Sequence, residues 1–210
     1  MFEHPLKNAY IGEYKEDVEY TADLSTYTLM QNYWGGTAVY QNGYITSTYE
    51  WGFAYKNVSN EIDISNAKII EFEYENYTVW KAWSDWVKWQ LQIVPPDSKM
   101  TTQSTPTLWV IVATQTSSWY NTRNVLIFNN SSYANTSTWW WVPLNARSTV
   151  KGVFDLENWT ASYVVNGVQK WTWTMPAADV QTIKNTTFLY VNLSVEVNNK
   201  MQNVKVMVHR

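Results

Sequence analysis

The chain has 210 residues, including 14 tryptophans, 15 tyrosines and no cysteine. The lack of cysteine excludes disulfides, thiolate nucleophiles and cysteine-based metal sites. The net charge of −3 argues against nucleic acid as a partner, because phosphate binding needs a basic surface. No segment has the run of about 18 apolar residues that a membrane-spanning helix needs. We therefore expect a protein that does not span a membrane and takes no cofactor and no metal.

The sequence divides into a short N-terminal segment and one larger domain. Residues 1–25 are acidic and weakly patterned, and we interpret them as an arm or a first edge strand. Residues 26–210 are predicted to form a single domain, since β-sandwiches commonly run to about 200–250 residues as one unit. The first five residues lack the basic and apolar regions of a signal peptide. This leaves a cytosolic protein, a mature secreted chain behind a new methionine, or a virion component.

Short strands separated by turn signals follow along the chain. Asn42-Gly43 and Asn166-Gly167 predict two hairpins, because a type I′ turn needs positive φ at both central residues. A helix is predicted over 176–183, where Pro176 stands near its start. Strands are predicted at 27–34, 37–41, 44–49, 68–77, 86–94, 108–114, 124–128, 139–142, 150–155, 159–165, 168–174, 188–197 and 204–209.

This pattern predicts an all-β fold, a two-sheet antiparallel β-sandwich of the jelly-roll type with one short helix. In the strand over 68–77, alternation assigns Ile70, Phe72 and Tyr74 to one face and three glutamates to the other. These glutamates, Glu71, Glu73 and Glu75, indicate a solvated outer face; the alternative is a bound cation that relieves their repulsion. Two histidines near the termini, His4 and His209, do not favour a catalytic triad or a histidine metal site.

Aromatic residues form the candidate binding sites. Their rings combine an apolar face with a polar tip, which suits a surface that binds sugars or another protein chain. Trp139-Trp140-Trp141 must use both faces of a strand, because successive side chains alternate. Trp171 and Trp173 share a face about 7 Å apart, a spacing that could stack neighbouring sugar rings; core packing is the alternative. Of the tryptophans at 80, 83, 86 and 89, Trp89 is predicted to be in the core.

N-x-S/T sequons suggest a glycosylated surface or virion protein. The alternative is that a composition rich in Asn and Thr generates them by accident. The low charge and the abundance of Asn, Thr, Tyr and Trp also resemble surface and viral proteins of thermoacidophilic archaea. The sequons stand at Asn57, Asn76, Asn129, Asn130, Asn135, Asn158, Asn185 and Asn192.

Several strings resemble glycoside hydrolase family 12, a concanavalin-like jelly roll that cleaves β-1,4-glucans. The segment 27–35, ending in Asn32-Tyr-Trp34-Gly35, is similar to the family's N-terminal strand, and the resemblance implies that Trp34 stacks on a sugar. Gly35-Gly36 would let a ligand approach closely. The segment 64–74 resembles a later strand of the family, 108–112 the strand with the nucleophile, and 188–197 the strand with the acid.

The catalytic pair of that family is missing. Retaining hydrolysis needs two carboxyl groups about 5–5.5 Å apart, yet Thr107 stands where the nucleophilic glutamate is required, and only Glu196 remains as a candidate acid. We therefore expect a non-catalytic extracellular-type glycoprotein of a cell surface or virion. Its aromatic face would bind glycan or sister subunits, through Trp34, Trp139, Trp141, Trp171 and Trp173, and a homo-oligomer is allowed. The alternative is an endo-β-1,4-glucanase in which Glu196 is catalytic.

Overall fold

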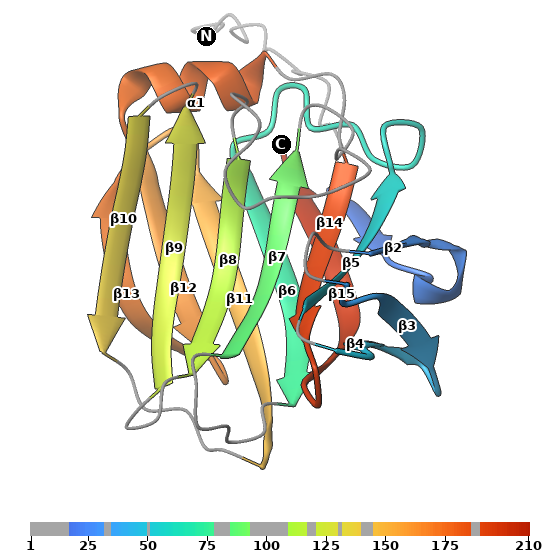
Figure 1. Cartoon of the computed structure of the whole chain (residues 1–210). Coiled ribbons are helices and arrows are strands. Elements are labelled where there is room, and N and C mark those ends of the chain that lie inside the picture. Colours follow the sequence, from blue (N-terminus) through green and yellow to red (C-terminus); the bar gives the residue numbers. More distant parts are fainter. Residues whose placement is uncertain are drawn as a thin grey trace, which may run out of the picture.

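A computed structural model gives the arrangement of the strands (Figure 1). Between residues 85 and 139, the structure describes the backbone of four strands and the way in which these strands pair. The structure describes residues 17–31, 35–49, 51–77, 85–92, 109–116, 121–129, 132–139, 145–185 and 190–210.

The first of two antiparallel sheets has eight strands and contains both ends of the described chain. The C-terminal strand lies inside this sheet, and β1 pairs with it, so the acidic N-terminal segment contributes a strand from Val18 onward. In pairing order the strands are β13 (Val168–Thr174), β12 (Thr160–Val165), β11 (Arg147–Asp155), β6 (Ile69–Tyr77), β15 (Lys200–His209), β4 (Tyr44–Ser47) and β3 (Ala38–Gln41), with β1 (Val18–Thr21) also on β15.

The second sheet has seven strands. Figure 1 shows the two sheets as stacked layers, with the helix α1 (Ala177–Lys184) across one end. A 3-10 turn, η1 (Leu24–Thr26), follows β1. This arrangement confirms the predicted two-sheet antiparallel sandwich with one short helix. In pairing order the strands are β10 (Ser132–Trp139), β9 (Asn121–Asn129), β8 (Trp109–Thr116), β7 (Asp85–Gln92), β14 (Tyr190–Glu196), β5 (Trp51–Asn57) and β2 (Thr28–Gln31).

The hydrophobic core fills the space between the layers. In β6 the predicted alternation is confirmed: Ile70, Phe72 and Tyr74 are buried, while the glutamates between them are half-buried on the outer face. Phe72 packs on Phe154 of β11 with ring centroids 5.4 Å apart. In the opposite sheet, every second residue of β14 is buried in the same core. Burial of this apolar area is the main source of stability in a chain without disulfides.

Asparagine-rich turns join the strands. Both predicted Asn-Gly hairpins are confirmed: φ is +50° and +84° at Asn42-Gly43, and +49° and +76° at Asn166-Gly167. Asparagine tolerates this left-handed conformation better than other non-glycine residues. Part of the asparagine content therefore serves turn geometry. The asparagines with positive φ are Asn42, Asn66, Asn145, Asn166, Asn198 and Asn203.

Two strands differ from the sequence prediction. Strand β5 was not predicted, because it is buried on both faces: Phe53 and Ala54 are adjacent, yet both are nearly inaccessible, so the strand lacks a polar-apolar alternation. Strand β10 was predicted over 139–142 but ends at Trp139. Its Ser-, Thr- and Asn-rich sequence has few of the β-branched apolar and aromatic residues that indicate a strand, yet it pairs throughout with β9.

Candidate functional site

The register of the seven-stranded sheet determines which positions share its outer face. Val191, Leu193 and Val195 of β14 are fully buried in the core, so Tyr190 and Glu196, which alternate with them, belong to the outer face. Residues paired directly in an antiparallel ladder share a face. The described pairs run from β2 to β10 without a register shift, so the assignment extends across the sheet.

Aromatic positions gather on this outer face. Among the described inner positions of the same strands, the register gives a single aromatic residue, Trp89, opposite Leu193 of β14. We call the outer set the aromatic face. Its nine members are Trp51, Phe53, Tyr55, Trp86, Trp109, Phe128, Tyr133, Trp139 and Tyr190.

Side chains of β5 and β14 define one end of the aromatic face. The rings of Tyr55 and Tyr190 lie 6.4 Å apart at 49°, and both are half-buried. Exposed Asn57 donates from Nδ2 to the hydroxyl of Tyr190 at 3.4 Å. Phe53 and Asn192 lie on the same face and are buried, 2% and 0% exposed, so the face is covered beside them. The accessible part at this end is the Tyr55–Tyr190 pair with its asparagine.

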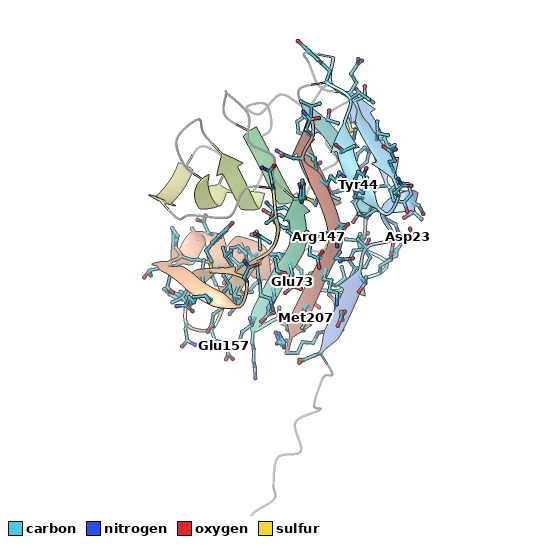
Figure 2. All side chains as sticks on the ribbon, turned by 90° about the horizontal axis from the view of Figure 1, so that it is seen from below. Asp23, Tyr44, Glu73, Arg147, Glu157 and Met207 are labelled. Carbon is cyan, nitrogen blue, oxygen red and sulfur yellow. The ribbon has the colours of Figure 1, made fainter. Side chains whose placement is uncertain are left out.

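The outer face of the eight-stranded sheet is charged instead. Lys151 Nζ lies 2.6 Å from Glu71 Oε2 and 3.3 Å from Glu73 Oε2. The predicted glutamate ladder therefore lies on an outer face, where a lysine of β11 offsets its repulsion. Figure 2 shows Tyr44, Arg147, Glu73 and Met207 following one another along this sheet. Within the described part of the chain, no three acidic or histidine side chains form a cluster suited to a metal ion.

The five predicted ligand-binding tryptophans have different positions. Trp139 belongs to the aromatic face, where it pairs with Thr122. Trp171 and Trp173 pair with Tyr163 and Ala161, which are buried, while Thr172 and Thr174 between and after them are exposed. The register assigns both positions to the inner face of their strand, the side of the core-packing alternative, and their stacking on sugars stays a prediction. Trp34 and Trp141 lie outside the described residues.

The sequons also divide by position. Asn76 and Asn192 are 1% and 0% exposed, so the folded chain leaves no room for a glycan on either amide. Asn57, Asn158 and Asn185 are exposed and stay candidates. Asn129 and Asn135 lie in β9 and β10, and Asn130 lies outside the described residues.

Glu196 is the carboxylate that the described strands assign to the aromatic face. It pairs with Trp51 at the end of β14. Thr107, which occupies the nucleophile position of the family resemblance, lies outside the described residues. Neither the sequence nor its motifs had indicated Tyr55 and Tyr190, because strand β5 gives no period-2 signal and the pairing of β14 between β5 and β7 joins distant segments.

No family model matches the chain, and no curated protein matches it either. Among solved structures, the CBM2 module of the evolved Dit of Lactobacillus casei BL23 phage J-1 has a TM-score of 0.59 at 9% identity, covering 93% of this chain and 99% of that one. The globular domain of T. cruzi calreticulin has a TM-score of 0.58 at 9% identity, covering 91% and 84%.

A plant lectin has the same fold. Winged bean acidic lectin, solved with methyl-α-D-galactose, has a TM-score of 0.55 at 13% identity, covering 92% of this chain and 98% of the lectin. The chain therefore has the jelly-roll β-sandwich fold of lectins and carbohydrate-binding modules.

No helix in the described part of this chain has the length and apolar character needed to cross a membrane.

Proposed function

We propose that the chain is a non-catalytic glycan-binding β-sandwich and that the aromatic face is its binding surface. The observation that carries the proposal is the segregation of aromatic positions in the described strands of the seven-stranded sheet: nine, of which Phe53 is covered, belong to the outer face and one to the inner face. Core packing does not require aromatic residues on an outer face. Sugars stack on such rings, and the exposed amide of Asn57 on the same face supplies a hydrogen-bond partner for their hydroxyls.

The fold comparison supports the same function. The similar winged bean lectin is a complex with methyl-α-D-galactose, and another similar structure is a carbohydrate-binding module. A neutral hexose is therefore the first ligand to test.

Titration of methyl α-D-galactoside and of β-glucan oligosaccharides, followed by calorimetry, tests the proposal. Trp139→Ala and Tyr190→Ala should each weaken binding of the sugar that the parent binds by roughly fivefold, since ring stacking contributes about 1 kcal/mol beyond area burial. Their melting temperatures should stay near that of the parent.

Trp89→Ala is the matched control, since Trp89 lies in the same sheet on the inner face. Its truncation should cost about 3–5 kcal/mol of unfolding free energy through the cavity left behind. If Trp139→Ala and Tyr190→Ala destabilise the protein as much and leave sugar binding unchanged, the aromatic face is packing surface. If the parent binds none of the sugars but self-associates, the face is a subunit interface.

The enzyme alternative has one supporting observation, the position of Glu196 on the aromatic face beside Trp51. A retaining mechanism needs a second carboxylate about 5–5.5 Å away, which would have to come from outside the described strands. Hydrolysis of a mixed-linkage glucan by the pure protein, abolished in Glu196→Gln, would establish the glucanase and contradict a non-catalytic role.

The extracellular, cell-surface or virion location belongs to the same proposal. It is supported by the exposed sequons at Asn158 and Asn185, which lie away from the aromatic face. The intact mass of protein from its native source tests it: an added glycan mass that decreases in Asn158→Gln supports surface glycosylation, and an unmodified mass removes the argument.

A further inference from the structure

A cavity of about 230 Å³ opens on the charged outer face of the eight-stranded sheet. It lies where β6 ends and where β11 and β15 begin, beside the β3–β4 turn. This position is on the opposite sheet from the aromatic face. The cavity residues that the argument uses are Tyr44, Tyr77, Arg147, Lys200, Glu75 and Gln202.

The register builds the cavity from two rows of neighbours. In the first row, Tyr77 of β6 is opposite Arg147 on one side and Lys200 on the other. The Lys200 ammonium also lies over two rings, 4.6 Å from the centroid of Tyr44 and 5.8 Å from that of Tyr77. These contacts hold the ammonium group at the cavity by cation–π attraction.

In the second row, Gln202 holds the carboxylate of Glu75, which is a hydrogen-bond acceptor. Gln202 Nε2 donates to Glu75 Oε2 at 2.8 Å. A register shift follows Gln202, where Asn203 has φ of +51°, and such bulges commonly re-aim side chains beside binding sites. The Gln202 hydrogen bond is the chief cause that lowers the pKa of Glu75, with a hydrogen bond from Asn203 and the charge of Arg147 acting in the same direction against partial burial. Glu75 is therefore ionised at neutral pH.

The cations of the cavity lack carboxylate partners at ion-pair distance among the described side chains. Every other lysine or arginine with a described side chain is ion-paired, except Lys184 at the end of α1. In a chain of net charge −3, two such cations beside one cavity indicate an anionic ligand. Arginine binds a carboxylate through two parallel hydrogen bonds, and lysine adds a point charge.

We propose that this cavity binds a single acidic sugar, of the uronic acid class. Its carboxylate would lie between Arg147 and Lys200, its ring against Tyr77, and its hydroxyls on Glu75 and Gln202. The volume is below the range of about 300–1,000 Å³ found for drug-sized ligands, which suits one monosaccharide. The ionised carboxylate of Glu75 accepts hydrogen bonds from hydroxyl groups, and it repels an anion that has no hydrogen-bond donor. This site is separate from the aromatic face and does not depend on its function.

A matched pair of probes tests the site: methyl β-D-glucuronide and methyl β-D-glucoside differ by a carboxylate in place of a hydroxymethyl group. Calorimetric or NMR titration of the full chain should give at least tenfold tighter binding of the glucuronide, weakening as salt rises. Lys200→Met and Arg147→Gln should each lower glucuronide affinity at least fivefold. Lys184→Met removes the same charge outside the cavity and should leave the affinity unchanged.

Several results would overturn the assignment. These are no glucuronide binding, equal binding of the two glycosides, or equal losses in Lys200→Met and Lys184→Met. Inorganic sulfate carries no hydroxyl donor at neutral pH, and its competition with the glucuronide at equal concentration would reduce the cavity to a general anion site. Tyr190→Ala should not change glucuronide affinity, so failure here and failure of the aromatic face are separable.

Discussion

Gly52 is the residue whose replacement the fold tolerates least among the glycines with described surroundings. It lies on the inner face of β5, where an added Cβ would stand 2.3 Å from the nitrogen and 2.5 Å from the Cα of Ala38. Both are backbone atoms of β3, so no side-chain rotation can relieve the clash. The close approach of β5 and β3 at this edge of the sandwich therefore depends on the missing side chain.

We predict that Gly52→Ala lowers the free energy of unfolding by about 3 kcal/mol or more, at the upper end of overpacking costs. Gly43→Ala is the control: φ is +84° there, but nothing lies within 4 Å of the added carbon. It should cost only the left-handed backbone penalty of about 1–2 kcal/mol. Urea unfolding of the two variants measures the difference, and equal losses would contradict the close contact.

At the scale of elements, the two Asn-Gly hairpins have the same backbone conformation but different side-chain bonds. Asn166 Oδ1 accepts from the backbone N–H of Thr149 at 2.9 Å, and the Asn166 N–H donates back to Thr149 O at 2.9 Å. No side-chain hydrogen bond of Asn42 is recorded in the described part of the chain. The β12–β13 hairpin is thus tied to β11, its neighbour in the sheet.

Asn166→Ala should therefore cost about 1 kcal/mol more unfolding free energy than Asn42→Ala. Both variants lose the tolerance of asparagine for the left-handed backbone conformation, but only Asn166→Ala also loses a hydrogen bond from a backbone N–H. Asn166→Gly keeps the turn geometry and isolates the hydrogen bond. Thermal unfolding of the three variants is the measurement, and equal effects at positions 42 and 166 would show that the bond to Thr149 contributes nothing.

Strands with a period-2 alternation, and elements bounded by turn or proline signals, were predictable from sequence, and strands without such a signal were not. Strands β6 and β13 and the helix have alternation, turn or proline signals of their own, and β13 matches its predicted bounds of 168–174. Strand β5 has adjacent buried residues and no such signal. The candidate sites could not be predicted, because they depend on the insertion of β14 between β5 and β7 and of β15 between β6 and β4. Local pattern does not encode these non-local pairings.

The whole molecule carries two outer faces of different character, and the charged one governs its stability in acid. A hydrogen bond with His209 lowers the pKa of Asp17, and one with Lys205 lowers the pKa of Glu19. The pKa of Glu75 is lowered as well. Carboxyl groups with lowered pKa values bind fewer protons when folded than when unfolded. Their contribution is present above the ordinary pKa of about 4 and is lost as pH falls through the folded values.

The alkaline limit has a different cause, in a buried pair of tyrosines between the sheets. The hydroxyls of Tyr20 and Tyr27 lie 3.3 Å apart, and both residues are 5% exposed. Burial raises the pKa of Tyr27 far above its usual value and raises that of Tyr20 as well. Their neutral forms thus stabilise the fold below the ordinary tyrosine pKa of about 10, and this contribution is lost at higher pH. Lys56, paired with Glu61, is the cation that faces the pair.

The melting temperature should therefore be level between about pH 5 and pH 9 and fall on both sides, because the two limbs involve different groups. Tyr27→Phe should make the melting temperature fall less steeply between pH 9 and pH 11, because one phenol fewer ionises when the chain unfolds. The fall below pH 5 should stay as in the parent. Glu75→Gln should do the reverse, reducing only the acid limb. Calorimetric scans of the three proteins from pH 3 to pH 11 provide the measurement. An alkaline limb that keeps its slope in Tyr27→Phe would mean that lysines such as Lys56, and not the buried phenols, set the upper limit of stability.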